Sequence, residues 1–327
     1  MALETPCWLP SRTVAFGLVI LLSACRSTPR PGDQLARSGD EISVCGSLFH
    51  TGTKVILWND QGGYDAYRPH RRFEPDKAGP SEAPDRIARF GSFRGGIPEA
   101  MSRRVREGGW SMEDLRQVVT KVVIHFDACG TSRRCFEVLH DVRGLSSHFM
   151  LDLDGTIYQT LDLKERAWHA GQANDSSVGI EIANVGAHGD LEALGKWYTT
   201  DSRGTRISLP MAADSGNLSH DFVGRPARAE PVEGRINSRN LIQYDFTVEQ
   251  YEALGKLLVT LRRIFPQIAA ELPRAPNGEV LDRALGSDEE LLRFRGILGH
   301  YHVTREKVDP GPAFQWERVL KAARGAE

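Results

Sequence analysis

Two histidines and one aspartate in this 327-residue chain have the composition of a catalytic zinc site. His125 follows the apolar run at 122–124, whereas His300 and Asp309 lie far downstream in a stretch that contains Gly and Pro. Two imidazoles and a carboxylate supply three protein ligands and leave a fourth position for water, as a catalytic zinc requires and a structural zinc does not. We therefore predict that these three residues bind Zn²⁺, with His302 as an alternative to His300.

A carboxylate within an apolar strand is the second chemical signal. Glu181 lies in the run 178–182, where an unpaired carboxylate is costly to bury, so we expect a functional role rather than a structural ion pair. The sequence has no phosphate-binding loop, no G-x-S-x-G and no H-E-x-x-H. With 41 Lys+Arg against 43 Asp+Glu, the chain lacks the basic excess that nucleic-acid binding demands, and we expect no nucleic-acid partner.

Short fragments in a fixed order surround these residues. They are VVIH at 122–125, SHF at 147–149 with an Asp-Gly turn at 154–155, AWHAG at 167–171, SVGIE at 177–181, GH at 299–300 and KVDPGP at 307–312. Over roughly residues 122–316 the chain thereby resembles the zinc-dependent N-acetylmuramoyl-L-alanine amidases, which share their fold with animal peptidoglycan-recognition proteins.

The resemblance implies a role for each residue of the site. His125, His300 and Asp309 correspond to the zinc ligands, Glu181 to the catalytic base, and Lys307 to the residue that stabilises the oxyanion. Zinc lowers the pKa of water toward ~7. A positioned carboxylate can then pass a proton to the leaving amine, and a cation stabilises the developing negative charge. The stretch from His300 to Asp309 is one residue shorter than in some bacterial members of the family.

The resemblance also implies the substrate, which is the amide between N-acetylmuramic acid and L-alanine in peptidoglycan or released muropeptides. We expect His169 in or beside the substrate cleft, with Trp168 packing against it. One alternative is a peptidoglycan-binding protein of the same fold that does not cleave. A second alternative is a zinc hydrolase of this fold that acts on another amide.

The first 25 residues have the pattern of an export signal. Arg12 precedes an apolar run at 14–22 that is too short to span a bilayer as a helix. The run ends in Leu-Ser-Ala-Cys at 22–25, which resembles a bacterial lipoprotein box, so we predict that Cys25 is lipidated. The protein would then be exported to the cell envelope and anchored to a membrane by its lipid. A plain secretory signal and an uncleaved anchor are the alternatives.

Export places the remaining cysteines in an oxidising compartment, where thiols pair. Cys129 and Cys135 are separated by only five residues, and we predict a disulfide between them. The same short loop resembles that of the recognition proteins. Cys45 is then left as a free thiol.

Composition divides the chain into four parts. Residues 1–25 are the signal, and the Pro-containing segment 26–40 suits a flexible linker. Residues 41–110 form a small extension of strands and irregular structure, and residues 111–327 form the zinc amidase domain. A weakly periodic stretch at 187–245 is expected to be an insertion in this domain.

Local patterns predict an α/β fold, with a mixed central β-sheet flanked by helices. Strands are predicted at 54–58, 64–67, 122–126 and 178–182, with a hairpin at 149–161 around Asp154-Gly155. Capping boxes at Ser111/Asp114 and Thr247/Gln250 predict helix starts. Further helices are expected at 135–142, ended by Gly144, and at 316–323, and a last strand or turn at 297–303.

Overall fold

The structure, a computed structural model, describes residues 1, 37–73, 89–209, 216–219 and 221–325. The chain divides into two compact units, Met1–Ala36 and Arg37–Glu327, and the second contains all the elements below. The predicted signal at 1–25, its Cys25 and most of the linker at 26–40 lie outside the described residues. Among the described helices, none has the length and apolar character needed to cross a membrane.

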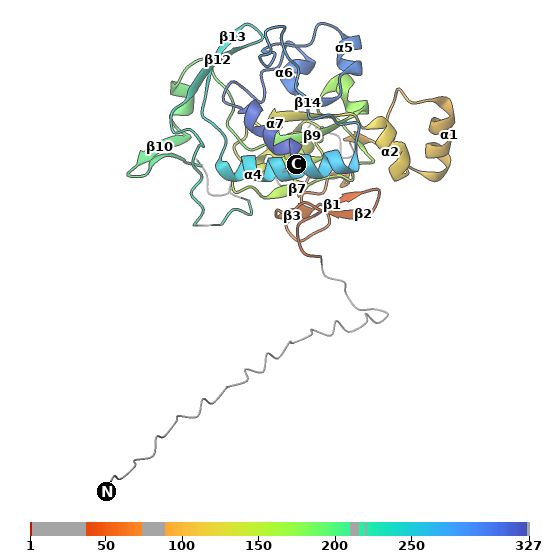
Figure 1. Ribbon diagram of the computed structural model, residues 1–327, viewed down its shortest axis with the longest axis horizontal. Coiled ribbons are helices and arrows are strands. Elements are labelled where there is room, and N and C mark those ends of the chain that lie inside the picture. The colour runs from red at the N-terminus through yellow and green to blue at the C-terminus, as the bar shows by residue number, and fades with distance from the viewer. Residues whose placement is uncertain (2–36, 74–88, 210–215, 220, 326–327) are drawn as a thin grey trace. The chain divides into compact units, whose positions relative to one another are not determined.

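A mixed six-stranded sheet forms the centre of the second unit (Figure 1). In the order β14-β5-β9-β6-β7-β3, its strands are Gly296–Gly299, Lys121–Phe126, Ser177–Ile182, Phe149–Leu151, Ile157–Gln159 and Val55–Leu57. The first four strands run parallel, β7 is antiparallel to β6, and β3 is parallel to β7. The predicted α/β fold class, with a mixed central sheet flanked by helices, is confirmed.

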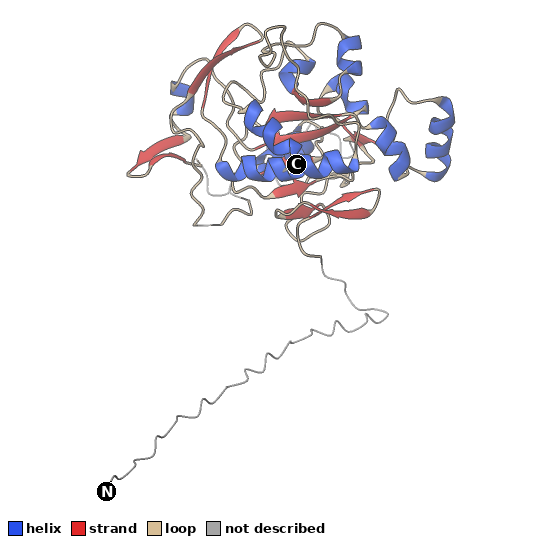
Figure 2. Cartoon of the chain, viewed as in Figure 1, coloured by secondary structure: helices blue, strands red, loops and turns tan. Residues whose placement is uncertain are grey.

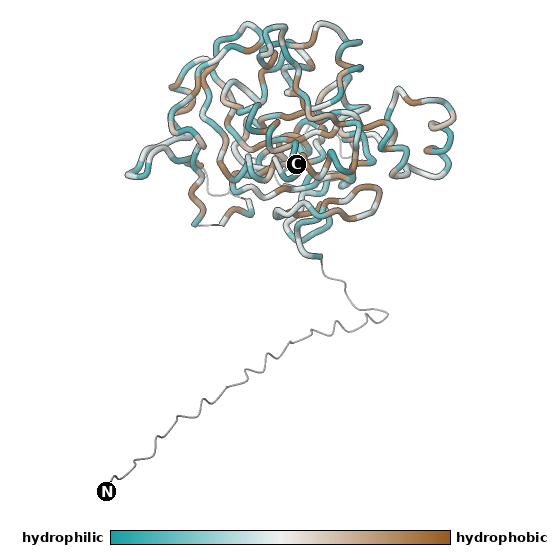
Figure 3. Tube along the Cα trace, viewed as in Figure 1, coloured by the Kyte–Doolittle hydropathy of each residue, from teal (hydrophilic) through white to brown (hydrophobic). Residues whose placement is uncertain are grey.

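The buried strands explain why apolar runs dominate the middle of the sequence. Every residue of β9 is buried, as are five of the six in β5, which is usual for parallel strands covered on both faces. In Figure 3 the projecting hairpin of β10 (Tyr198–Asp201) and β11 (Gly204–Ile207) is largely hydrophilic, in contrast to these buried strands. Because β14, β5 and β9 are adjacent and parallel, their carboxyl ends lie side by side at one edge of the sheet.

The long helix α4 (Val248–Ile264) covers one face of the sheet together with the terminal helix α7 (Trp316–Arg324) (Figure 1). The predicted capping box is present, because the Thr247 side chain accepts from the Gln250 backbone and the Gln250 side chain accepts from that of Thr247. A Cβ atom at Gly255 would lie 2.8 Å from the Cβ of Ala322, so only glycine permits this close helix crossing.

The predicted helix start at Ser111, the helix at 135–142 and the turn at Asp154-Gly155 also form in the structure. Ser111 caps α2 (Met112–Val118) by accepting from the Asp114 backbone. The helix predicted at 135–142 is α3 (Ser132–Phe136) continued by a π-helical turn, η1 (Glu137–Val142). At the β6–β7 turn, Gly155 has a φ of +80°, which glycine adopts without strain.

The segment 41–110 contributes one strand to the central sheet. Its strand β3 pairs with β7, and the hairpin of β1 (Glu41–Val44) and β2 (Ser47–His50) precedes it. The prediction of a strand at 64–67 is wrong, because none of these residues is in a strand and residues 66–67 form a turn. The Tyr64 ring instead stacks on Tyr158 and Phe136 in a small apolar cluster, and this packing overrides the local pattern.

The described residues of the stretch 187–245 include two hairpins, which Figure 2 shows on the side of the sheet away from α1 (Glu99–Gly108). They are β10–β11 (Tyr198–Asp201 and Gly204–Ile207) and β12–β13 (Val232–Ile236 and Arg239–Gln243). The remaining elements are β4 (Phe90–Gly91) paired with β8 (Arg166–Ala167), the 3₁₀ turns η2 (Gly171–Asp175) and η3 (Glu192–Leu194), and the helices α5 (Asp288–Arg293) and α6 (His300–Val303).

Candidate active site

The three predicted ligands converge at the carboxyl edge of the sheet. Nδ1 of His125 lies 3.0 Å from Nδ1 of His300 and 2.8 Å from Oδ2 of Asp309, and the His300–Asp309 distance is 3.0 Å. All three residues are buried. They form a group whose ligand atoms lie close enough to hold one metal ion.

Strand order brings these residues together. Gly299, the last residue of β14, is paired with Ile124 of β5, and the residue that follows each of them in sequence is a histidine of the site. The backbone N–H of Tyr301 donates to the carbonyl of Asp309, which returns the chain to the site after α6. His125 and His300 therefore meet although 175 residues separate them in sequence.

The donor set fits zinc. Bonds of about 2.0–2.2 Å place neighbouring ligand atoms of a tetrahedral zinc about 3.3 Å apart, close to the three separations found here. Burial, followed by the charge of His300, lowers the pKa of His125 to about 4, so its imidazole is neutral. Burial alone would raise the pKa of Asp309, but His300 and His125 hold it below its usual value. A neutral imidazole and an ionised carboxylate are the protonation states that bind metal.

Glu181 is the carboxyl group next to this cluster. The register of β5 and β9 pairs it directly with His125, and its Oε1 lies 3.9 Å from Nδ1 of that histidine. Burial raises the pKa of Glu181 well above its usual range, the charges of Asp309 and Asp127 raise it further, and Lys307 opposes them. A carboxyl group with a raised pKa beside a ligand cluster suits proton transfer at neutral pH.

His169 is brought to the site, but both of its ring nitrogens already have partners. Nδ1 lies 3.0 Å from Nε2 of His125, and Nε2 lies 3.2 Å from Oγ of Ser177. His125 therefore directs Nδ1 toward the ligand cluster and Nε2 toward His169. A partner on the second nitrogen fixes the tautomer and the orientation of a ligating imidazole.

Lys307 and Trp168 are half-buried residues at the margins of the site. The charge of Lys307 lowers the pKa of Glu181, which places the lysine within electrostatic reach of that carboxyl. The backbone N–H of Trp168 donates to Oγ of Ser146, which fixes the start of the segment that carries His169. A substrate-binding role for Trp168 and His169 stays a prediction.

The alternative ligand His302 is directed elsewhere. Its Nδ1 accepts from the backbone N–H of Gly299, and its Nε2 lies 2.8 Å from the carbonyl oxygen of Leu281. Helix α6 separates it from His300 by two residues, which turns the two rings to different sides. His302 is therefore a packing residue, and His300 is the histidine of the cluster.

The described cysteines Cys45, Cys129 and Cys135 are all free thiols in the structure. Cys135 is buried and Cys129 is half-buried, and both contact the apolar cluster around Tyr158. The structure thus differs from the predicted Cys129–Cys135 disulfide, which stays a prediction. Sγ of Cys45 lies 3.4 Å from the carbonyl of Trp110.

Sequence reasoning missed Arg94, which is buried beneath the site. Its guanidinium donates to the carbonyls of Asn174, Asp175, Ser177, Leu163 and Glu165 and lies 3.3 Å from Nε2 of His148. His148 in turn accepts from the Gly179 backbone in β9. Because Arg94 belongs to a segment with little periodicity, no local pattern marks it.

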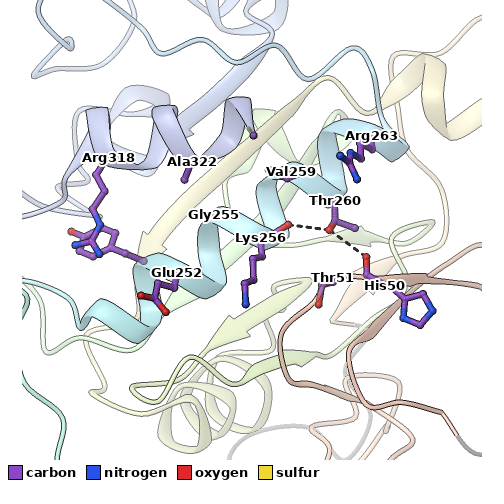
Figure 4. A pocket seen from close by; sticks show the side chains of 12 residues that line it. His50, Thr51, Glu252, Gly255, Lys256, Val259, Thr260, Arg263, Arg318 and Ala322 are labelled. Carbon is purple, nitrogen blue, oxygen red and sulfur yellow. Dashed lines mark hydrogen bonds between the residues drawn. The ribbon is translucent and has the colours of Figure 1, made fainter. Parts of the chain in front are cut away.

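A separate cavity of about 510 Å³ lies on the α4–α7 face (Figure 4). The side chains of Lys256, Arg263 and Arg318 line it, together with His50 from β2. It shares no residue with the ligand cluster. We therefore assign the chemistry to the carboxyl edge of the sheet.

Two imidazoles and two carboxyl groups that meet at the carboxyl edge of the sheet could hold a metal ion and transfer a proton, which is the chemistry of a hydrolase site. The family model for N-acetylmuramoyl-L-alanine amidase matches residues 115–312, a span that includes every residue of the cluster. The chain belongs to this family of enzymes.

Comparison with solved structures returns proteins of low overall similarity. A selenomethionine derivative of AmpD is 19% identical with a TM-score of 0.32, covering 63% of this chain and 86% of its own. AmiD from E. coli, in complex with a muropeptide substrate, is 19% identical with a TM-score of 0.36, covering 64% and 58%. AmpDh3 from Pseudomonas aeruginosa, in complex with anhydromuramic pentapeptide, is 17% identical with a TM-score of 0.34, covering 62% and 59%. No curated protein matches.

Proposed function

We propose that the protein is a zinc-dependent amidase that hydrolyses the bond between N-acetylmuramic acid and L-alanine in peptidoglycan or in released muropeptides. The observation that carries this proposal is the meeting of His125, His300 and Asp309 with Glu181 at the carboxyl edge of the sheet. Family membership supports the reaction, and the donor set supports zinc.

The chain's own residues supply the proton transfers. When bound, zinc acts as a Lewis acid, lowers the pKa of water toward ~7 and favours the ionised form of Glu181. Glu181 accepts a proton from the attacking water and delivers it to the leaving nitrogen as the C–N bond breaks. Lys307 stabilises the negative charge that develops on the carbonyl oxygen. The products are a carboxylate on the muramic acid and a free amino group on L-alanine.

A non-catalytic peptidoglycan-binding protein is the rival of a different class. Such a protein would need the cleft but neither a complete ligand set nor a base. The complete ligand set and the adjacent Glu181 both favour the enzyme. A hydrolase acting on a different amide would share all these groups, so product identity separates it from our proposal.

We further propose that the enzyme is exported and anchored to a membrane of the cell envelope through a lipid on Cys25. The lipobox-like Leu-Ser-Ala-Cys at 22–25 supports this proposal, and it matches a substrate that lies outside the cytoplasm. Mass spectrometry of the mature N-terminus tests it. A mature chain that starts elsewhere, or that carries no acyl group, would contradict the anchor.

The decisive experiment incubates the purified protein with defined muropeptides, with and without a chelator, and identifies the products by mass spectrometry. We expect free stem peptides with an L-alanine amino terminus, their loss after chelation, and their return with added zinc. Full activity after exhaustive chelation would refute the zinc proposal, and cleavage at another amide would refute the proposed substrate bond.

A further inference from the structure

The hairpin β12–β13 from the insertion at 187–245 contacts the segment that carries His300, Lys307 and Asp309. Nδ2 of Asn237, at the hairpin turn, donates to the carbonyl of Lys307 at 2.7 Å. The same amide group lies 3.2 Å from the carbonyls of Tyr301 and Thr304. One side chain thus binds three backbone carbonyls within the stretch that separates two ligands.

The local structure explains why an asparagine occupies this position. The last carbonyls of a helix lack partners within it, and α6 ends at Val303, so the Tyr301 carbonyl needs a donor from elsewhere. The Thr304 carbonyl accepts from the Lys307 backbone N–H as well as from Asn237. Asn237 has a φ of 47° in a tight turn, a conformation that asparagine tolerates better than most residues. Its Oδ1 accepts from the Ala284 backbone, and this bond orients the amide nitrogen toward the three carbonyls.

A second contact lies at the other end of the hairpin. Gln243 is fully buried, its Nε2 donates to the carbonyl of Pro310, and its Oε1 accepts from the backbone N–H of Ala313. Gly311, with a φ of +90°, has no room for a side chain, because a Cβ atom would collide with the Gln243 amide. The turn immediately after Asp309 is therefore built against Gln243.

We propose that Asn237 and Gln243 are positioning residues, which hold Lys307 and Asp309 respectively at the geometry needed for catalysis and zinc binding. The catalytic part of this proposal, the positioning of Lys307, rests on the proposed function. Outside the four residues of α6, the stretch from His300 to Asp309 has no helix or strand of its own. Its internal backbone bonds beyond those of α6, from Tyr301 N–H to Asp309 and from Lys307 N–H to Thr304, are few, and the contacts with the hairpin add to them. The insertion thereby acts on the site through backbone contacts.

The test compares four full-length proteins: the wild type, Asn237→Asp, Gln243→Met and the control Asn240→Asp. Asn240 is exposed on the same hairpin, so its substitution makes the same chemical change away from the site. Three quantities are measured: the zinc Kd by chelator competition, kcat and KM on a muropeptide, and amide hydrogen exchange across residues 300–313.

For Asn237→Asp we expect kcat to fall roughly 10- to 100-fold with little change in KM or in zinc Kd, since such indirect partners of a site typically contribute that much. For Gln243→Met we expect zinc Kd to rise by about the same factor. Both variants should exchange faster across 300–313 and not across β5 and β9, whereas the control should match the wild type.

Wild-type exchange across 300–313 in both variants would overturn the proposal. So would a loss of protection that extends equally over β5 and β9, because the residues would then merely stabilise the fold. If the wild type fails to cleave but the exchange and zinc results are as expected, the proposed function fails and the positioning role stands. If the wild type cleaves and both variants behave like the control, the positioning role fails and the proposed function stands.

Discussion

The two ends of strand β5 bury ionisable groups in different ways. At the carboxyl end, the imidazole of His125 lies within hydrogen-bonding distance of His300, Asp309 and His169. At the amino end, Lys121 is equally buried, and Nζ donates to Oγ of Ser176 at 2.9 Å. Among the described residues, no carboxylate forms an ion pair with Lys121.

The two ends of β5 thus differ in whether their buried polar groups are arranged to bind a ligand. Neutral and anionic donors that converge at the carboxyl end would bind a cation, which would compensate for their burial. The Lys121 ammonium group at the amino end has no such ligand. Its burial destabilises the folded protein and lowers its pKa to about 8. Substitutions at the carboxyl end should therefore impair activity, whereas replacing Lys121 should improve stability.

Removing the base should have the largest effect. Glu181→Gln keeps the size of the side chain but removes the proton acceptor, so kcat should fall by roughly 10²–10⁴ while zinc still binds. Steady-state kinetics with metal analysis measures both quantities, and Glu192→Gln, an exposed glutamate, is the control. Near-wild-type turnover would make Glu181 a structural residue, and loss of zinc would make it a ligand.

Lys307→Ala should have the next largest effect. Loss of one group that stabilises the oxyanion costs on the order of 10²–10³ in kcat, with little change in substrate affinity. Lys256→Ala, on the α4–α7 face, removes the same charge away from the site and should leave kcat unchanged (Figure 4). A rise in KM with unchanged kcat would show that Lys307 only binds substrate.

His169→Ala should weaken zinc binding by about 10- to 100-fold, because Nε2 of His125 loses its partner. His169→Asn retains an acceptor near the position of the lost Nδ1 and should restore part of the affinity. Chelator competition measures the zinc Kd of each variant, with exposed His70→Ala as the control. An unchanged zinc Kd in His169→Ala would contradict the orienting role and leave the predicted substrate contact as the alternative.

At the amino end, Lys121→Met should stabilise the protein at pH 7. A pKa lowered from 10.5 to about 8 corresponds to a destabilisation of about 3 kcal/mol, and the lost hydrogen bond to Ser176 offsets about 1 kcal/mol of the gain. Between pH 8 and 10.5 the unfolded chain binds more protons than the folded one, so wild-type stability rises with pH.

The advantage of Lys121→Met should consequently be largest below pH 8 and shrink as the pH approaches 10.5. Urea unfolding of the variant, the wild type and the exposed-lysine control Lys54→Met at pH 7 and at pH 10 measures it. A variant less stable than the wild type at pH 7 would show that the ammonium group is stabilised in ways that burial and one hydrogen bond do not describe.

Sequence predictions were correct where the interacting groups are close together in the sequence, and they failed where the groups are far apart. The N-cap at Ser111, the capping box at Thr247 and the Gly155 turn were predictable because each involves groups within a few residues of one another. The strand predicted at 64–67 failed because long-range stacking of Tyr64 on Tyr158 competes with the local pattern. Arg94 was missed because all its partners lie in other segments of the chain.

The sequence by itself determined the chemical types at the site: two imidazoles, two carboxylates and an ammonium group, in an order that resembles a known family. Only the tertiary structure decided that Glu181 stands opposite His125, that His169 contacts the second nitrogen of that ring, and that the β12–β13 hairpin contacts the Lys307 segment through Asn237. The physical reason is that side-chain chemistry is a property of each residue alone. Strand order and register instead depend on how the whole chain buries its apolar surface.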